Sequence, residues 1–262
     1  PASRCRVLVV VCTPRGRCLG GQTAWDCPRA THRVRPRVYA PVVIPRPVAE
    51  RAMLNESVVS VSQFSRQRLD QVHELADRCL PVVTERRVCR ALDGHVLANL
   101  FFEPSTRTRL SFDTAFLRLG GRVATTVGMQ FSSMAKGETL EDTIAVIDGY
   151  ADAIVLRHPV EGSAQRAARV ATVPVINAGD GAGEHPTQSL LDLYTIRREL
   201  GAIDGLSIAL VGDLKYGRTV HSLARALGAY RDIRLILAGP DQLPMPESIV
   251  TELRNGGMTV EI

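Results

Sequence analysis

Hydroxyl and guanidinium side chains gather directly after an apolar run in the middle of the chain. The run from Val96 to Phe102 predicts a buried parallel strand, and Ser105 then takes the N-cap position of a predicted helix. Backbone N–H groups at a helix N-terminus lack internal partners and attract anions, and arginine donates paired hydrogen bonds to phosphate oxygens. Residues 105–109, Ser-Thr-Arg-Thr-Arg, therefore predict a phosphate site, with an ordinary capped helix as the simpler alternative.

Strand and helix patterns alternate along most of the chain, and these elements must position the reactive residues. Alternation at this spacing predicts parallel sheets with right-handed crossovers. Ligands of such sheets bind at the carboxyl ends of the strands. Arg157, His185 and Arg218 each follow a predicted strand, so we expect them at the same edge as the phosphate site.

Composition divides the chain into an unusual beginning and an ordinary body. Residues 1–50 hold nine arginines against two acidic residues, whereas the remainder holds 23 basic and 25 acidic residues. The body therefore predicts no nucleic-acid partner.

No apolar run approaches the length of a membrane span, so no membrane partner is expected. The six cysteines form no Cys-x-x-Cys pair, which predicts structural thiols and no metal site.

The predicted domain organisation has three parts. Residues 1–53 are rich in arginine and proline and poor in acids, which is typical of an organellar transit peptide. A first domain is expected over 54–183, ending in a glycine-rich turn, and a second over 184–262. The second domain is expected to be incomplete, because the chain stops within a strand pattern.

Five stretches resemble, in order, the signature motifs of the transcarbamylase family. Residues 105–109 resemble its carbamoyl-phosphate motif, and residues 132–139 resemble the mobile loop of aspartate transcarbamylases. The other three are Arg157-His158-Pro159, His185-Pro186-Thr187-Gln188, and Asp213 to Thr219. The resemblance covers the chain from about Ser57 to its end.

This resemblance implies an α/β fold with two doubly wound parallel-sheet domains of the aspartate/ornithine transcarbamylase type, the second one truncated. The first domain would bind carbamoyl phosphate and the second L-aspartate. The implied reaction moves the carbamoyl group to the amino group of aspartate and releases phosphate, in de novo pyrimidine (UMP) synthesis. It needs no cofactor and no metal, so catalysis would rest on positioning and electrostatic stabilisation.

The resemblance also implies roles for the matched residues. The phosphate would be held by Ser105, Thr106, Arg107 and Thr108. The carbonyl oxygen of carbamoyl phosphate would be polarised by Thr108, Arg157 and His185.

Four further residues complete the implied site. Gln188 would bind the carbamoyl amide, and Arg218 would pair with a carboxylate of aspartate. Ser132 would reach the carbamoyl phosphate of a neighbouring subunit, and Lys136 would act there in aspartate binding and catalysis. Active sites would thus be shared across the interfaces of a homotrimer.

Two alternatives remain open at this point. Ornithine transcarbamylase shares the Ser-Thr-Arg-Thr-Arg type of motif, but it lacks the lysine-bearing loop and an arginine at the place of Arg218. The other alternative is a truncated, non-catalytic subunit. Family members continue beyond the position of Ile262 with a second aspartate-binding arginine, so a protein ending there is expected to bind phosphate with little or no turnover.

The family resemblance also implies a cellular location and an inhibitor for this protein. Plant and algal members with a similar leader are plastid proteins, often inhibited by UMP at the active site. We therefore expect a chloroplast location, with the cytoplasm as the alternative, and inhibition by UMP. A reporter fused to residues 1–50 that stayed in the cytosol would contradict the plastid assignment.

Overall fold

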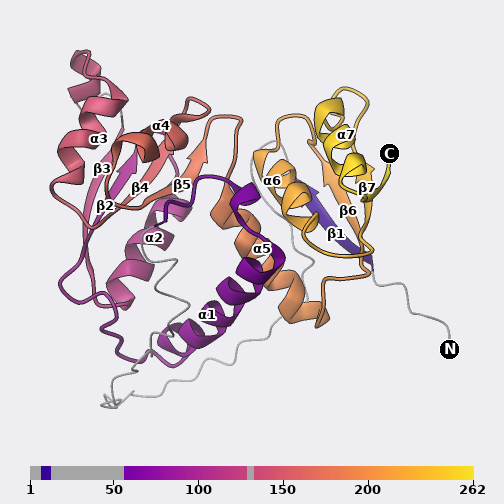
Figure 1. Cartoon of the computed structure of the whole chain (residues 1–262), viewed down its shortest axis with the longest axis horizontal. Helices are drawn as coiled ribbons and strands as arrows, with labels where there is room; N and C mark the ends of the chain where they lie inside the picture. Colours follow the sequence, from indigo (N-terminus) through magenta and orange to yellow (C-terminus); the bar gives the residue numbers. More distant parts are fainter. Residues whose placement is uncertain (1–6, 13–55, 129–132) are drawn as a thin grey trace, which may run out of the picture.

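The computed structural model describes residues 7–12, 56–128 and 133–262. Two four-stranded sheets, each built of parallel strands, stand side by side (Figure 1). Two long helices lie across the space between and beneath them. These helices are α1 (Arg66–Thr84) and α5 (Pro186–Leu200). The predicted α/β fold with two parallel sheets is confirmed.

The first sheet has the strand order β3-β2-β4-β5, and every pair is parallel. Its strands are β2 (Val96–Phe101), β3 (Arg122–Val127), β4 (Ala153–His158) and β5 (Val175–Asp180). Helix α2 (Thr106–Arg118) packs Phe112 and Phe116 on one face. Helices α3 (Leu140–Asp148) and α4 (Ser163–Val170) cover the other face. Helices on both faces bury both sides of β2 and β4, which explains their apolar runs, whereas the edge strand β3 is largely exposed.

The second sheet has the strand order β1-β6-β7-β8 and is also parallel. Its strands are β1 (Val7–Cys12), β6 (Ser207–Gly212), β7 (Arg234–Ala238) and β8 (Thr259–Glu261). Helices α6 (Arg218–Leu227) and α7 (Glu247–Asn255) carry buried residues of the same core, to which α5 also contributes. The predicted boundary at residue 183 falls between β5 and α5.

Strand β1 was not anticipated, because residues 1–53 were interpreted as a leader outside the folded domains. The structure pairs Val7 with Ser207 and continues in register to Cys12 and Gly212. Val-Leu-Val-Val-Val-Cys is a β-branched apolar run, and such residues favour a buried parallel strand. The other residues of the leader lie outside the described ranges, and its role as a transit peptide stays a prediction.

The N-terminal end of the first domain is tied to the loop before α5. A short 3-10 helix, η2 (Val61–Gln63), precedes α1. Glu184 accepts hydrogen bonds from the Ser60 hydroxyl at 2.9 Å and from the Val61 N–H at 2.8 Å. This contact anchors the segment between β5 and α5, which carries part of the site described below.

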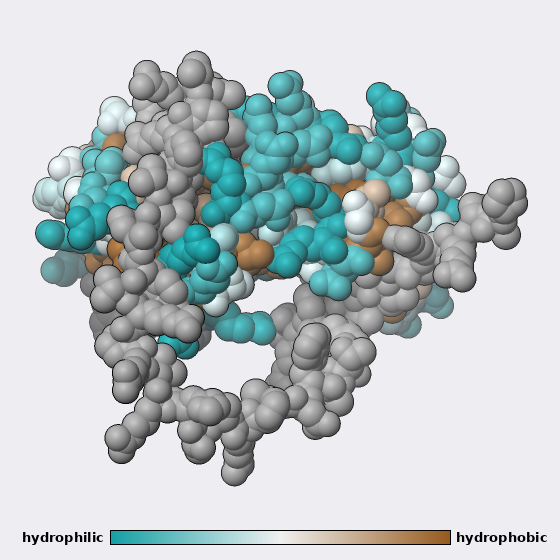
Figure 2. Space-filling view, turned by 90° about the horizontal axis from the view of Figure 1, so that it is seen from below, coloured by the Kyte–Doolittle hydropathy of each residue, from teal (hydrophilic) through white to brown (hydrophobic). Residues whose placement is uncertain are grey.

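The surface seen from below is largely hydrophilic where residues are described, with separate hydrophobic areas between them (Figure 2). Among the described residues, no helix is both long enough and apolar enough to cross a lipid bilayer.

Candidate active site

Parallel register brings Glu103 and Arg157 together at the carboxyl ends of β2 and β4. Phe101 pairs with Arg157, and the Phe102 N–H donates to the Arg157 carbonyl oxygen at 2.9 Å. Glu103 follows immediately, and its Oε1 accepts a hydrogen bond from Arg157 Nη2 at 2.7 Å. The side chain of Arg157 is only 9% exposed. A buried guanidinium of this kind is held by its carboxylate partner in a single orientation.

Arg218, the first residue of α6, reaches the same carboxylate from the second domain. Its Nη2 lies 3.5 Å from Glu103 Oε1, and its Nη1 donates to the Gly181 carbonyl oxygen at 2.5 Å. Arg157 Nη1 donates to the carbonyl oxygen of Ala178, within β5, at 3.1 Å. Two guanidiniums, one from each domain, therefore converge on Glu103 and on the backbone at the end of β5.

Gly179 is the position where the two guanidiniums pass close to the backbone. A Cβ atom here would lie 3.0 Å from Arg157 Nη1 and 3.3 Å from Arg218 Cζ. The backbone φ of Gly179 is +111°, a conformation that residues with a side chain rarely adopt. Glycine is therefore required both for the conformation and for the approach of the arginines.

His185 precedes α5 and is buried beside the arginine pair. Its backbone N–H donates to the Ser222 hydroxyl at 3.2 Å, and its Nδ1 lies 3.3 Å from the Thr187 hydroxyl. Burial, reinforced by the positive charges of Arg157 and Arg218, lowers the pKa of His185 to about 3. The imidazole is therefore neutral near pH 7 and acts as a hydrogen-bonding group, not as a cation.

The lowered pKa of His185 has a measurable consequence for stability. The unfolded chain, with an ordinary histidine pKa near 6.5, binds a proton that the folded chain rejects. The contribution of this pKa difference to the free energy of unfolding is therefore fully present above about pH 6.5. It decreases as the pH falls toward 3. Urea titrations between pH 7 and pH 5 measure how the unfolding free energy changes with pH. We expect this change to be smaller in His185→Gln than in the wild type, by up to about 1.4 kcal/mol per pH unit. Equal slopes in the two proteins would contradict this.

The N-terminus of α2 offers an anion site next to Glu103. Ser105 is the N-cap, as predicted, yet its side chain makes no capping hydrogen bond. Its hydroxyl instead donates to the Thr108 hydroxyl at 3.0 Å. The first turn of α2 contains no acidic residue. An uncapped N-terminus without acidic side chains favours an anion through its N–H groups and its dipole.

Gln188 lies in the first turn of α5, one turn after His185. Its backbone N–H donates to the His185 carbonyl oxygen at 3.1 Å. Its side-chain Nε2 donates to Asp192 Oδ1 at 2.9 Å. Gln188 thus lies one turn from His185, and its contact with a carbamoyl amide stays a prediction.

Lys136 of the predicted mobile loop has no described contact with this cluster. Lys136 is exposed at the end of the short 3-10 helix η4 (Ser133–Lys136), before α3. None of the described contacts joins it to Arg157, His185 or Arg218. Ser132 lies outside the described residues.

Sequence reasoning missed three carboxylates around the site. Glu103 stands within the Phe-Glu-Pro-Ser-Thr-Arg stretch, so its position next to the phosphate motif could have identified it as a site residue. Asp180 accepts hydrogen bonds from the N–H groups of Gly162 at 3.0 Å and Glu184 at 3.2 Å, which organises the β5–α5 segment. Asp192 carried no signal in the sequence except its spacing of four residues from Gln188.

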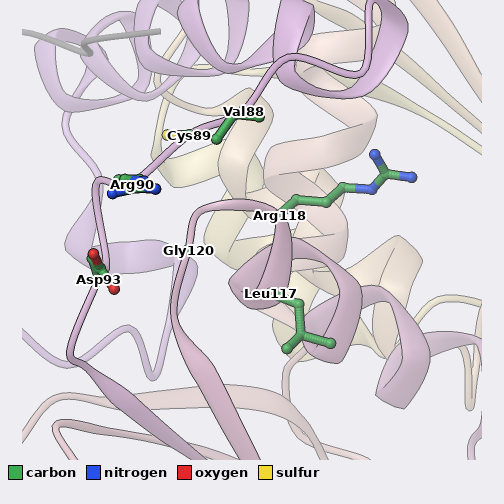
Figure 3. A pocket seen from close by; sticks show the side chains of 7 residues that line it. All are labelled: Val88, Cys89, Arg90, Asp93, Leu117, Arg118 and Gly120. Carbon is green, nitrogen blue, oxygen red and sulfur yellow. The ribbon is translucent and has the colours of Figure 1, made fainter. Parts of the chain in front are cut away.

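A separate hollow of about 470 Å³ lies near the other end of α2. Two facing chain segments line it (Figure 3), and they contribute Val88, Cys89, Arg90, Asp93, Leu117, Arg118 and Gly120. None of the predicted site residues is among them. Within the described ranges, no three His, Cys, Asp or Glu side chains are grouped so that they could hold a metal ion.

Comparison with known proteins agrees with this arrangement. Residues 56–198 match the family model "Aspartate/ornithine carbamoyltransferase, carbamoyl-P binding domain". The aspartate carbamoyltransferase catalytic subunit of Archaeoglobus fulgidus is 53% identical over 196 residues, which is 75% of this chain and 65% of that protein. The corresponding subunit of Cellvibrio japonicus is 51% identical over 209 residues, 78% of this chain and 62% of that protein. The chain therefore spans less than two thirds of the length of these relatives.

Solved structures show the same likeness. The catalytic subunit of M. jannaschii aspartate transcarbamoylase superposes with a TM-score of 0.75 at 48% identity, over 79% of this chain and 67% of that one. Aspartate transcarbamoylase from Trypanosoma cruzi, in complex with N-(phosphonacetyl)-L-aspartic acid, also has a TM-score of 0.75, at 43% identity over 80% of this chain and 67% of that one.

Proposed function

Because the chain belongs to the aspartate/ornithine carbamoyltransferase family, we propose that it transfers the carbamoyl group of carbamoyl phosphate to the amino group of L-aspartate. The products are N-carbamoyl-L-aspartate, used in pyrimidine synthesis, and phosphate. The observation that carries the proposal is the convergence of Arg157 and Arg218, one from each domain, on Glu103 beside the N-terminus of α2. His185 is buried next to the same two guanidiniums.

The proposed reaction needs charge stabilisation and no protein nucleophile. The amino nitrogen of aspartate attacks the carbonyl carbon, a C–N bond forms, and the oxygen gains negative charge. The C–O bond to the phosphate then breaks, the phosphate leaves with the electron pair, and the nitrogen loses its proton. Arg157, Thr108 and neutral His185 supply donors for the oxyanion, and donors fixed before the reaction are the most effective.

The phosphate end of the ligand is assigned to the start of α2. The N–H groups of the first turn and the side chains of Ser105, Thr106, Arg107 and Thr108 are suited to a doubly negative group. The Ser105–Thr108 hydrogen bond keeps both hydroxyls at this end of the helix. Arg157 and His185 then lie on the carbonyl side of the same ligand.

Arg218 supports aspartate rather than ornithine as the acceptor. Its side chain is 18% exposed, so it is fixed by Glu103 and Gly181 but remains accessible. A guanidinium in the acceptor region attracts a carboxylate and repels the side-chain ammonium of ornithine. Ornithine transcarbamylase activity is therefore the second candidate, and a non-catalytic subunit is the third.

Measuring carbamoylation of L-aspartate and L-ornithine by the full-length protein tests the proposal. We expect transfer to aspartate only, and an increase of about tenfold or more in the KM for aspartate in Arg218→Gln. Arg225→Gln is the matched control: Arg225 lies on the same helix but pairs with Glu252 of α7, so the change is expected to leave KM unchanged. Transfer to ornithine, or carbamoyl phosphate binding without transfer to either, would favour the other candidates.

We propose further that the protein assembles as a homotrimer with shared active sites. Lys136 is exposed and has no described contact with the cluster of its own chain, which supports a role at a neighbouring chain. Helix α2 and the edge strand β3 present apolar side chains to solvent: Leu110, Leu117 and Val127 are 47%, 54% and 40% exposed. An unpaired sheet edge with exposed apolar residues is suited to burial in an interface.

A further inference from the structure

Three side chains follow one another at intervals of about one helical turn, beginning at the residue that caps α5. His185, Gln188 and Asp192 are three and four residues apart, so they lie on one face of the helix. Gln188 Nε2 donates to Asp192 Oδ1 at 2.9 Å. The face therefore runs from the carbonyl-binding histidine, through the amide, to a carboxylate that does not touch the proposed ligand site.

A glutamine amide has a donor side and an acceptor side, and Asp192 selects between them. An ionised carboxylate only accepts hydrogen bonds. The Gln188 nitrogen must therefore face Asp192, and the Gln188 oxygen Oε1 lies on the opposite side of the amide. Carbamoyl phosphate carries an amino group, which needs an acceptor such as Oε1. In the reversed orientation the two amino groups would oppose each other.

We propose that Asp192 is a positioning residue that orients the Gln188 amide and so makes the site select a carbamoyl group over an acyl group of the same shape. This inference rests on the proposed function. It deepens that function by naming what distinguishes carbamoyl phosphate from acetyl phosphate, in which a methyl group replaces the amino group.

The environment of Asp192 supports this role. Burial raises the pKa of Asp192 to about 6, and the hydrogen bond from Gln188 opposes the rise. The carboxylate is half-buried, with the Gln188 amide as its described partner. Burying a charge is unfavourable, and a strongly perturbed group next to a ligand site is a functional candidate. The simpler alternative is an ordinary pair of helix residues four positions apart.

Binding of carbamoyl phosphate and acetyl phosphate at pH 7.5, measured by calorimetry, separates the two interpretations. The quantity compared is the ratio of the two dissociation constants. In Asp192→Leu the amide loses its partner, and we expect the preference for carbamoyl phosphate to fall about 3- to 10-fold. In Asp192→Asn the amide can pair in either orientation, so we expect a fall of about twofold. Asp192→Asn also carries the test should Asp192→Leu fail to fold.

Two comparisons show whether the effect passes through Gln188. Glu199→Gln removes an exposed carboxylate from the same helix and is expected to leave the ratio unchanged. In a Gln188→Leu background, adding Asp192→Leu is expected to change the ratio no further. An Asp192→Leu protein that loses affinity for both ligands equally, or an undiminished ratio in both Asp192 variants, would overturn the inference while leaving the proposed function intact. A wild-type protein that binds neither ligand would overturn both.

Discussion

Replacement of Arg157 by glutamine is expected to lower carbamoyl transfer to aspartate by about 10²- to 10³-fold. The guanidinium is held by Glu103 at 2.7 Å and by the Ala178 carbonyl at 3.1 Å, so it is oriented before the ligand arrives. A neutral glutamine cannot balance the charge that develops on the carbonyl oxygen. The loss should appear mainly in kcat, because the charge develops during the reaction.

Arg157→Lys provides a sharper version of this test. Lysine keeps the positive charge but has a compact ammonium that cannot donate in the planar, forked geometry of arginine. We expect it to remain at least tenfold below the wild-type rate. Arg225→Gln controls for loss of an arginine outside the site and should keep the wild-type rate. An Arg157→Gln protein within tenfold of wild type would remove Arg157 from the proposed mechanism.

Mixing two inactive variants, Arg107→Ala and Lys136→Ala, is expected to restore about a quarter of the wild-type activity. In a shared site, Arg107 comes from one subunit and Lys136 from its neighbour. A mixed trimer then contains one site in which both residues are native. With random mixing of equal amounts, three quarters of the trimers are mixed and one third of their sites are active.

The experiment requires that subunits exchange, so the two variants are unfolded and refolded together. Each variant refolded alone is the control and should stay inactive. Sedimentation should show a trimer in every sample. Refolded mixtures that are trimeric yet inactive would mean that each site is built within one chain.

Local patterns along the chain were sufficient for most of the fold. The apolar run before Pro104 became β2, and the predicted cap Ser105 starts α2. Arg157, His185 and Arg218 were expected at strand ends and lie there together. These predictions succeeded because strand periodicity, turn residues and helix caps are properties of neighbouring residues.

Other features depended on contacts between distant residues. Strand β1 was missed because an arginine- and proline-rich segment is typical of a leader, and only pairing with β6 makes its six apolar residues a strand. Glu103 was missed because its partners, Arg157 and Arg218, lie 54 and 115 positions further along the chain. The predicted contribution of Lys136 to a neighbouring subunit stays a prediction.

The sequence by itself determined which residue types carry the chemistry and at which element ends they stand, because these are encoded in short motifs. Only the tertiary structure decided how they are oriented. The parallel register of β2 and β4 sets Glu103 beside Arg157, and the close packing at Gly179 admits the two guanidiniums. Burial then keeps His185 neutral and raises the pKa of Asp192, and burial is a property of the folded chain as a whole.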